Sequence, residues 1–385
     1  MDYTDDAVAR DLAKRYLQDP IGADLAEKMI FLSGPRQVGK TTLALQAIGA
    51  ADARHPAYLS WDDPRTRPRI KRGELPPDEP RVILDEIHKY ARWRNLVKGL
   101  WDTRPPGTSF IITGSARLDV YRRGGDSLHG RYHAYRLHPL SLREAGGGRD
   151  VLDGLLRFGG FPEPFLRASE RHWRRWQRER LDRIVRDDVR DLERVREISL
   201  IELLVDALPS RVGSPLSVKN LREDLEVAHD TAERWLDILE NLYVCFRIPP
   251  FGSPRIRAVK KSPKLYLWDW SAVEDEGARF ENLVASHLLK LCHFVADTQG
   301  HRMELRFLRD TDGREVDFVV LRDRKPLFAV EAKTGERAVS PAIRYFRERT
   351  PIPAWYQVHR GTTDAMIGGV RVLPFGSLCA ELDIP

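Results

Sequence analysis

The sequence has few cysteines and no long apolar run, and these two scarcities exclude several classes of protein. Its 385 residues include three cysteines, Cys245, Cys292 and Cys379, which lie far apart in the chain. They form neither a disulfide framework nor the closely spaced pairs of a zinc knuckle. The N-terminus is acidic, and no apolar stretch approaches the length that spans a membrane. We therefore predict a cytoplasmic protein with no membrane partner.

Charged residues are abundant but nearly balanced. The chain has 63 lysines and arginines against 57 aspartates and glutamates, a formal net charge of +6. An excess of this size is compatible with a polyanionic partner but does not establish one. The length predicts two or three domains.

The clearest signal is a glycine-rich loop between an expected strand and an expected helix. Residues 34–41 fit the Gly-x-x-x-x-Gly-Lys-Ser/Thr phosphate loop. Such a loop curls so that its N–H groups and the helix dipole face a polyphosphate. Lys40 is expected to reach the β- and γ-phosphates, and the Thr41 hydroxyl to bind Mg²⁺. The loop residues predicted to bind ATP are Gly34, Pro35, Arg36, Gln37, Val38, Gly39, Lys40, Thr41 and Thr42.

A second apolar strand, residues 81–86, ends in two carboxylates. We predict that Asp85 holds Mg²⁺, directly or through water, and that Glu86 is the catalytic group that polarises the attacking water. A capped buried strand is the alternative, but the position downstream of a phosphate loop favours the functional interpretation. The same loop also occurs in small-molecule kinases. The second carboxylate favours hydrolysis because it is placed to activate water.

Two further positions in this half are candidates. A strand at residues 109–115 places Thr113 and Ser115 at its carboxyl end, where open α/β sheets bind ligands. Either hydroxyl is a candidate sensor of the γ-phosphate, with an ordinary turn as the alternative, and we count Ser115 among the nucleotide-binding residues. Arg131, which precedes a fifth strand, is either a catalytic arginine finger or a helix cap.

The middle of the chain is predicted to be mainly helical. Residues 141–208 indicate a helical lid whose charges alternate in sign, as on a solvated helix face. Residues 209–265 indicate a winged-helix-like module, with one helix from Ser217 to Leu225 and a second from Thr231 to Leu242. The second helix is acidic and would repel phosphates, which favours a structural or protein-contact role over DNA reading. A basic group downstream is the better candidate for phosphate contact, with a solvated strand edge as its alternative: Arg255, Arg257, Lys260, Lys261 and Lys264.

The last segment, residues 266–385, carries a second group of ionisable residues. Strands are expected at 303–308, 315–321 and 327–333. If Leu321 faces Leu327 across the turn, Asp317 faces Glu331, and Lys333 shares a face with Glu331. Opposed carboxylates are unfavourable unless a cation neutralises them.

Glu281 belongs to the same prediction. It borders the apolar stripe of an amphipathic helix, although a surface salt bridge would also explain it. We predict a Mg²⁺ site formed by Glu281, Asp317 and Glu331, with Lys333 beside it.

Several segments together resemble a large prokaryotic family of AAA-type P-loop ATPases. They are residues 34–42, Leu84-Asp85-Glu86, Thr113-Gly114-Ser115, Ser127-Leu128-x-Gly130-Arg131, His138-Pro139-Leu140-Ser141 and Gly159-Gly160-Phe161-Pro162-Glu163. In that family a C-terminal domain of unassigned function, similar to PD-(D/E)XK restriction-endonuclease-like nucleases, is fused to the ATPase. The resemblance implies an α/β fold with an AAA-type core at residues 1–140 and a nuclease-like domain at 266–385. It also implies ATP hydrolysis, with Arg131 at the family's Gly-Arg position.

Two functions are compatible with these features. In the first, Mg²⁺-dependent ATP hydrolysis is coupled to a metal-dependent nuclease that acts on DNA or RNA. The resemblance places Glu281, Asp317, Glu331 and the catalytic Lys333 at the nuclease positions. In the second, the chain is a nucleotide-switched binding or regulatory ATPase whose nuclease-like domain recognises a partner without cleaving it. ATP, ADP and Mg²⁺ are ligands in both, and an Arg131 finger acting across subunits would require a homo-oligomer.

Overall fold

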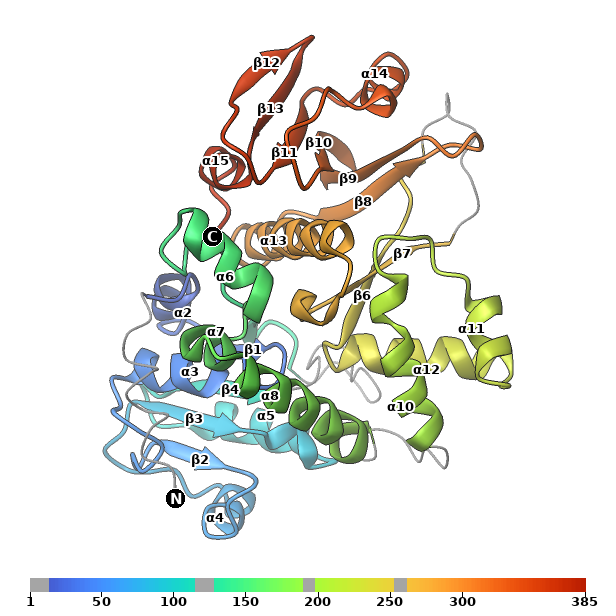
Figure 1. Ribbon diagram of the computed structural model, residues 1–385. Helices are drawn as coiled ribbons and strands as arrows, with labels where there is room; N and C mark the ends of the chain where they lie inside the picture. The colour runs from blue at the N-terminus through green and yellow to red at the C-terminus, as the bar shows by residue number, and fades with distance from the viewer. Residues whose placement is uncertain (1–13, 115–127, 190–197, 253–261) are drawn as a thin grey trace. The chain divides into compact units, whose positions relative to one another are not determined.

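The computed structural model describes residues 14–114, 128–189, 198–252 and 262–385 (Figure 1). Ser115 lies outside the described residues, as do Arg255, Arg257, Lys260 and Lys261. The chain forms two compact units, residues 1–139 and 140–385. In the described part of the chain, no helix combines the length and the apolar character needed to cross a membrane.

The N-terminal unit is built on a five-stranded sheet in which every pairing is parallel, in the order β2-β3-β4-β1-β5. The predicted parallel α/β core is thus confirmed. All five residues of β1 are buried, as expected for a strand covered on both faces. The strands are β1 (Met29–Ser33), β2 (Tyr58–Ser60), β3 (Arg81–Asp85), β4 (Ser109–Gly114) and β5 (Tyr132–Arg136).

One helix precedes β1, and helical segments follow β1, β2 and β3. They are α2 (Gln18–Asp24), α3 (Lys40–Ile48), α4 (Arg67–Arg72), the 3₁₀ turn η1 (Ile87–Lys89) and α5 (Trp93–Thr103). The α5 side chains Trp93 and Val97 pack in one core with Phe31, Leu84 and Phe110 of the strands. This packing fixes the strand ends from which the loops emerge.

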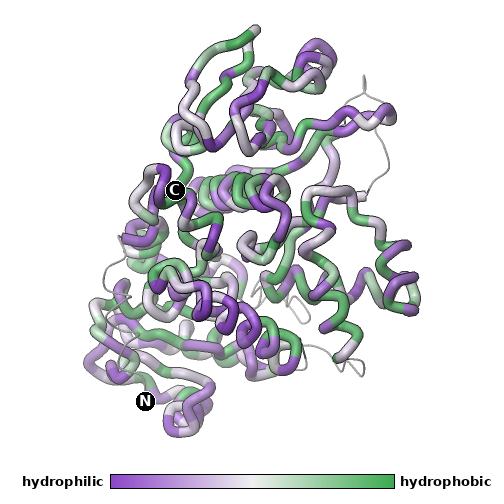
Figure 2. The backbone as a smooth tube through the Cα atoms, in the orientation of Figure 1, coloured by the Kyte–Doolittle hydropathy of each residue, from purple (hydrophilic) through white to green (hydrophobic). Residues whose placement is uncertain are grey.

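The C-terminal unit begins with helices. These are α6 (Arg149–Phe158), α7 (Pro162–Arg167), α8 (Glu170–Arg183) with a π-helical turn η2 (Ile184–Asp188), α10 (Ile198–Ala207), the 3₁₀ turn η3 (Pro209–Arg211), α11 (Val218–Asp224) and α12 (His229–Asn241). Hydrophilic residues run along most of α8 (Figure 2), where Arg174 lies 3.3 Å from Glu170. Within α8 the charged residues thus lie on a solvated helix face, as predicted, whereas residues 190–197 of the charged stretch lie outside the described residues.

The predicted two-helix module matches α11 and α12 closely. The Ser217 side chain accepts a hydrogen bond from the Asn220 N–H and caps α11, as expected. The second helix starts two residues earlier than predicted, at His229. An antiparallel pair follows, formed by β6 (Cys245–Ile248) and β7 (Lys264–Leu267). Whether this arrangement works as a winged helix stays a prediction.

The rest of the unit is a six-stranded mixed sheet in the order β12-β13-β11-β10-β9-β8. The long helix α13 packs along β8, β9 and β10, whereas α14 packs against β9 (Figure 1). The elements are the 3₁₀ turn η4 (Trp270–Ala272), α13 (Glu276–Gln299), β8 (Met303–Arg309), β9 (Glu315–Arg322), β10 (Lys325–Ala332), α14 (Pro341–Arg347), β11 (Trp355–His359), β12 (Ala365–Ile367), β13 (Val370–Pro374) and α15 (Phe375–Glu381).

The hairpin of β9 and β10 differs from its predicted register near the turn. Leu321 pairs with Pro326, not with Leu327. The turn is only two residues long, because Asp323 and Arg324 adopt the positive φ angles of 52° and 70° that suit a tight hairpin. A bulge then inserts one residue into β10, and beyond it the register is the predicted one: Phe328 with Val320, Ala329 with Val319 and Val330 with Phe318.

Gly160 occupies a position where a side chain has no room. A Cβ atom there would lie 2.8 Å from the Leu140 carbonyl oxygen and 2.9 Å from a ring carbon of Trp270. We expect Gly160→Ala to lower the free energy of unfolding by about 1–3 kcal/mol, as other overpacked cores do. In a domain of this size the melting temperature should fall by roughly 2–4 °C per kcal/mol.

Gly154→Ala is the matched control for this melt. Gly154 lies within α6, and its nearest neighbour, the Phe165 ring, would be at an ordinary 3.4 Å. Because alanine favours a helix interior, this variant should melt at or slightly above the wild-type temperature. Equal melting of Gly160→Ala and wild type would contradict the packing argument.

Candidate nucleotide site and acidic cluster

The parallel register brings the phosphate loop and the predicted Mg²⁺ ligand to one edge of the N-terminal sheet. Asp85 at the end of β3 is level with Thr113 of β4, and Thr113 is level with Leu32 of β1. The loop begins directly after β1. The carboxyl ends of three neighbouring strands therefore lie side by side, at the place where open α/β sheets bind ligands.

The loop itself has the conformation that its glycines predict. Gly39 has a φ of +97° immediately before α3, and a Cβ on Gly34 would collide with the Leu137 carbonyl oxygen. Lys40 is buried, and its Nζ donates to the carbonyls of Gly34, at 2.9 Å, and Pro35, at 2.7 Å. The lysine is thus held over its own loop, where it can exchange these carbonyls for phosphate oxygens.

Arg15 supports the loop from the N-terminal segment. Its guanidinium is buried and donates to the Val38 carbonyl at 2.9 Å and to the His138 carbonyl at 2.6 Å. It therefore ties the middle of the phosphate loop to the segment that follows β5. No local pattern in the sequence indicates this role.

Hydroxyl groups hold both oxygens of the Asp85 carboxylate. Tyr58 on β2 donates to Oδ2 and Thr113 on β4 donates to Oδ1. Burial, followed by the nearby charge of Glu86, raises the pKa of Asp85, and the two hydroxyls oppose that rise. The candidate sensor Thr113 therefore has another role, which is to orient Asp85. Tyr58 was not predicted, because nothing local in the sequence links it to Asp85.

Glu86 adopts an unusual backbone conformation just beyond β3. Its φ is +54°, in the left-handed region that few non-glycine residues adopt. Its N–H donates to the Thr113 carbonyl at 3.1 Å, and its carboxylate lies 3.5 Å from the Lys89 ammonium. Strain of this kind often accompanies functional positions, since the surrounding structure must maintain it.

These residues fit ATP with Mg²⁺. Thr41 is a half-buried residue in the first turn of α3, and Asp85 is a buried residue at the end of β3. Hydroxyl and carboxylate oxygens are the ligands that Mg²⁺ accepts alongside phosphates. Thr42 is exposed on the same turn.

Arg131 lies at the opposite end of the strands from the phosphate loop. Its carbonyl accepts a hydrogen bond from Met29, the first residue of β1, whereas the loop follows the last residue of that five-residue strand. A strand of that length spans roughly 17 Å. The Arg131 guanidinium lies 3.0 Å from Asp102. Arg131 is therefore not part of the phosphate site of its own chain.

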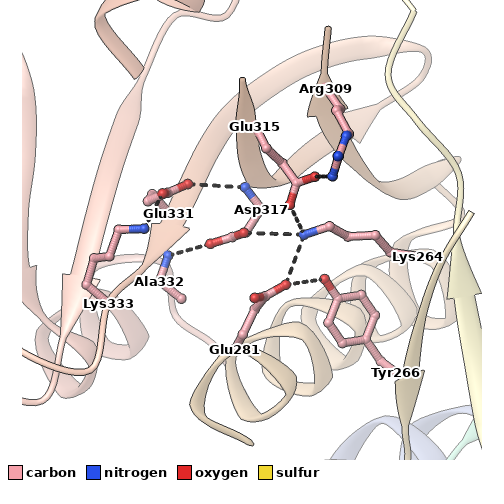
Figure 3. Close-up of polar contacts among 9 residues, drawn as sticks. All are labelled: Lys264, Tyr266, Glu281, Arg309, Glu315, Asp317, Glu331, Ala332 and Lys333. Atoms are coloured by element: carbon pink, nitrogen blue, oxygen red, sulfur yellow. Dashed lines mark hydrogen bonds and ion pairs between the residues drawn. The ribbon is translucent and has the colours of Figure 1, made fainter. Parts of the chain in front are cut away.

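The C-terminal unit brings together all four side chains predicted for a metal site (Figure 3). The Asp317 N–H donates to Glu331 Oε2 at 3.3 Å, and Asp317 Oδ2 accepts from the Ala332 N–H at 2.9 Å. Lys333 Nζ lies 2.6 Å from Glu331 Oε1. Glu281 approaches from α13 on the far side of Asp317 (Figure 3). We call Glu281, Glu315, Asp317 and Glu331 the acidic cluster.

Lys264 also lies within this cluster, although the charge pattern of the sequence predicts that it contacts phosphates with the basic group downstream of α12. Its Nζ lies 3.0 Å from Glu281 and 3.4 Å from Asp317, and it also pairs with Glu315. The side chain is fully buried. The prediction that Lys264 belongs to a phosphate-contacting basic group is therefore wrong, because a charge pattern along the chain does not show which lysine a strand turns inward.

Burial and mutual repulsion act on the carboxyl groups. Burial, followed by the charge of Asp317, raises the pKa of Glu281 to about 7 and that of Glu331 to about 8. Burial alone would lower the pKa of Lys264, but the charges of Asp317, Glu281 and Glu315 raise it above its ordinary value.

A divalent metal does not fit the cluster in this arrangement. The Lys264 ammonium lies where Glu281 and Asp317 converge (Figure 3). Across the described ranges, no three His, Cys, Asp or Glu side chains are arranged to hold a metal ion.

The acidic residues of α12 are also paired internally. Arg247 of β6 lies 2.8 Å from Glu233, 2.5 Å from Asp237 and 2.8 Å from Glu240. The negative charge of α12, which was expected to repel phosphates, is thus partly compensated by Arg247.

Comparison with known families assigns the N-terminal unit. Residues 26–146 match a family model described as an AAA domain. Together with the parallel sheet and its phosphate loop, this match makes the unit an AAA-type P-loop domain. Residues 149–274 and 276–378 match two domains of unknown function, DUF8612 and DUF4143.

Curated relatives cover different shares of the chain. An uncharacterized protein of Mycobacterium tuberculosis is 27% identical over 243 residues, which cover 63% of this chain and 54% of the relative. An uncharacterized protein of Methanocaldococcus jannaschii is 24% identical over 360 residues, covering 84% of this chain and 79% of the relative. The chain thus spans about half the length of the mycobacterial relatives it matches.

Solved structures with some likeness include AMPPCP-bound DnaA from Aquifex aeolicus, at 17% identity and a TM-score of 0.31, covering 62% of this chain and 89% of DnaA. The RuvB Holliday junction branch migration motor of Thermotoga maritima gives 15% identity and a TM-score of 0.31, covering 64% of this chain and 90% of RuvB. At these TM-scores neither carries weight for this chain.

Thr113→Val removes one hydroxyl donor from Asp85 and nearly preserves the side-chain shape. Loss of a group that orients a metal ligand typically costs 10–100-fold in affinity or activity. We expect Mg²⁺-dependent ATP turnover to fall by about this factor and the Mg²⁺ concentration for half-maximal turnover to rise. Thr113→Ser, which keeps the hydroxyl, is the control. A Thr113→Val protein with unchanged turnover and unchanged Mg²⁺ dependence would contradict the orienting role.

Proposed function

We propose that this protein hydrolyses ATP with Mg²⁺ in its N-terminal unit and that the bound nucleotide controls what its C-terminal unit recognises. One observation carries the first part. Asp85 lies, through Thr113, at the level of Leu32 in the strand that leads into the phosphate loop. Hydroxyls from two neighbouring strands hold its carboxylate in place.

Each residue of the site has a defined task in this proposal. The loop N–H groups and Lys40 bind the β- and γ-phosphates. Thr41 and Asp85 would hold Mg²⁺, which supplies positive charge to the phosphate oxygens when it is bound. Glu86 accepts a hydrogen bond from the attacking water and orients it toward the γ-phosphate.

Hydrolysis is favoured over phosphate transfer to a small molecule by the position of Glu86. Its left-handed conformation begins a new backbone direction directly after Asp85. A carboxylate adjacent to the Mg²⁺ ligand serves to activate water, whereas a kinase needs a binding site for a second substrate.

Recognition of a partner is the role that the arrangement of the C-terminal unit favours. Its carboxylates are engaged with Lys264 and Lys333, so that they are neutralised without a metal. The partner classes to be tested are DNA, RNA and protein.

A metal-dependent nuclease coupled to the ATPase is the second candidate. One observation favours it: Glu281, Asp317 and the Glu331–Lys333 pair come from three separate stretches of the chain and converge in one cluster. In that case the three carboxylates would be the metal ligands and Lys333 the catalytic lysine. The Lys264 ammonium would then have to move away from Glu281 and Asp317.

Glu86→Gln tests the proposed hydrolysis directly. The amide keeps the side-chain size but no longer polarises water, so we expect ATP to bind with near wild-type affinity while turnover falls about 10²–10⁴-fold. Lys40→Ala is the comparison, since it should weaken ATP binding itself. Turnover and binding of a fluorescent ATP analogue measure the two effects separately. Wild-type turnover in Glu86→Gln would exclude Glu86 as the group that activates water.

Arg131 can contribute to catalysis only from a neighbouring subunit, because it lies at the far edge of its own sheet. Arginine fingers are worth about 10³–10⁵ in rate where they have been measured. We expect Arg131→Ala and Lys40→Ala to be inactive alone and to regain activity when mixed. In the mixture some interfaces pair an intact loop with an intact Arg131. Absence of recovery at every mixing ratio would argue against a finger in trans.

A further inference from the structure

We propose that Lys264 is the resident cation of the acidic cluster and takes the place that a divalent metal would otherwise occupy. The C-terminal unit then works without a bound metal. This inference is independent of ATP hydrolysis in the N-terminal unit, so that either can fail without affecting the other.

The ammonium of Lys264 uses its bonding capacity fully. A lysine has three N–H donors, and Lys264 faces three carboxylates: Glu281 at 3.0 Å, Asp317 at 3.4 Å and Glu315. The side chain is fully buried, and its ammonium also lies 5.7 Å from the centre of the Phe307 ring. A group so enclosed and so well bonded does not leave its position at low cost.

Charges around the cluster nearly cancel without any metal. The four carboxylates of the cluster face the ammonium groups of Lys264 and Lys333 and the guanidinium of Arg309, which lies 2.8 Å from Glu315. A divalent cation added to this set would bring repulsion from Lys264 at the point where the carboxylates converge. The negative charge that would attract a metal ion is therefore largely compensated by these cationic side chains.

The oxygens that a metal would need are already engaged. Glu281 Oε1 accepts from both Lys264 and the Tyr266 hydroxyl, the latter at 2.7 Å. Asp317 Oδ1 faces Lys264 and its Oδ2 accepts from the Ala332 N–H. Mg²⁺ demands near-ideal octahedral oxygen geometry and gives up its water reluctantly, so it competes poorly for oxygens held in this way.

Lys264 also connects elements that are distant in the sequence. It stands at the start of β7, whereas Glu281 belongs to α13, and Glu315 and Asp317 belong to β9. The ammonium thus joins a two-stranded sheet, a helix and the main sheet at one point, as a structural metal often does. Without a metal there is no metal-activated water, and the unit is suited to recognition instead of cleavage.

Thermal melts of the nucleotide-free, full-length protein test the proposal, each in chelator and in excess Mn²⁺. The wild type should melt at the same temperature in both. Lys264→Ala leaves the carboxylates facing one another across a space, so it should melt lower in chelator. Mn²⁺ should then restore part of the loss by binding to the folded state. Adding Asp317→Asn to Lys264→Ala should remove that response and assign it to the cluster.

Lys290→Ala is the matched control. Lys290 is also buried, lies on α13 and pairs with the carboxylate of Glu144. Its loss should lower the melting temperature with no response to Mn²⁺, because one carboxylate is not a metal site. If Lys264→Ala behaves like Lys290→Ala, Lys264 is an ordinary buried ion pair and the proposal is overturned.

The wild type provides a second test that needs no folded Lys264 variant. A Mn²⁺-induced rise in its melting temperature that Asp317→Asn abolishes would show a metal at the cluster with Lys264 in place. That result would overturn the proposal and favour the nuclease candidate, while ATP turnover would remain unaffected as a test of the N-terminal unit. Equal responses of wild type and Asp317→Asn support Lys264 as the resident cation.

Discussion

Burial of carboxylates is the constraint on which both candidate sites depend, and the two units satisfy it in different ways. In the N-terminal unit, Asp85 receives two hydroxyl donors, which orient the carboxylate without cancelling its charge. We propose that the site is thereby prepared for a cation that binds together with the nucleotide. In the C-terminal unit, Asp317 and its neighbours already face the ammonium of Lys264. A buried carboxylate left without a partner would lower the stability of the fold, so each arrangement has to supply hydrogen-bond donors or a cation.

This difference gives each unit a distinct relation to its ligands. The nucleotide site depends on strand register, which brings Asp85 through Thr113 level with Leu32, two residues before the phosphate loop. The strained backbone of Glu86 is maintained by the same strands through its hydrogen bond to Thr113. The acidic cluster depends instead on a cross-link between elements, in which one lysine joins β7, α13 and β9. We therefore propose catalysis for the first unit and recognition for the second.

Much of the nucleotide site could be predicted from the sequence because its signals are local. The phosphate loop, the strand before it and the Asp85-Glu86 pair each occupy a short contiguous stretch, and strand direction then places them together. The hairpin at Asp317 and Glu331 was predicted in the correct register beyond the bulge, although the turn is tighter than expected. What escaped prediction involves contacts across the fold. Neither the Tyr58–Asp85 hydrogen bond nor the inward orientation of Lys264 leaves a trace in local spacing or charge.

The number of metal ions bound per chain distinguishes these two ways of treating buried carboxylates most directly. Titration of the full-length protein with Mn²⁺, followed by electron paramagnetic resonance, should show no tightly bound ion without nucleotide. With a non-hydrolysable ATP analogue it should show a single ion per chain, held at the phosphate loop. Tight binding of Mn²⁺ without nucleotide, or of a second ion with it, would contradict the view that the first site awaits its cation and the second already has one.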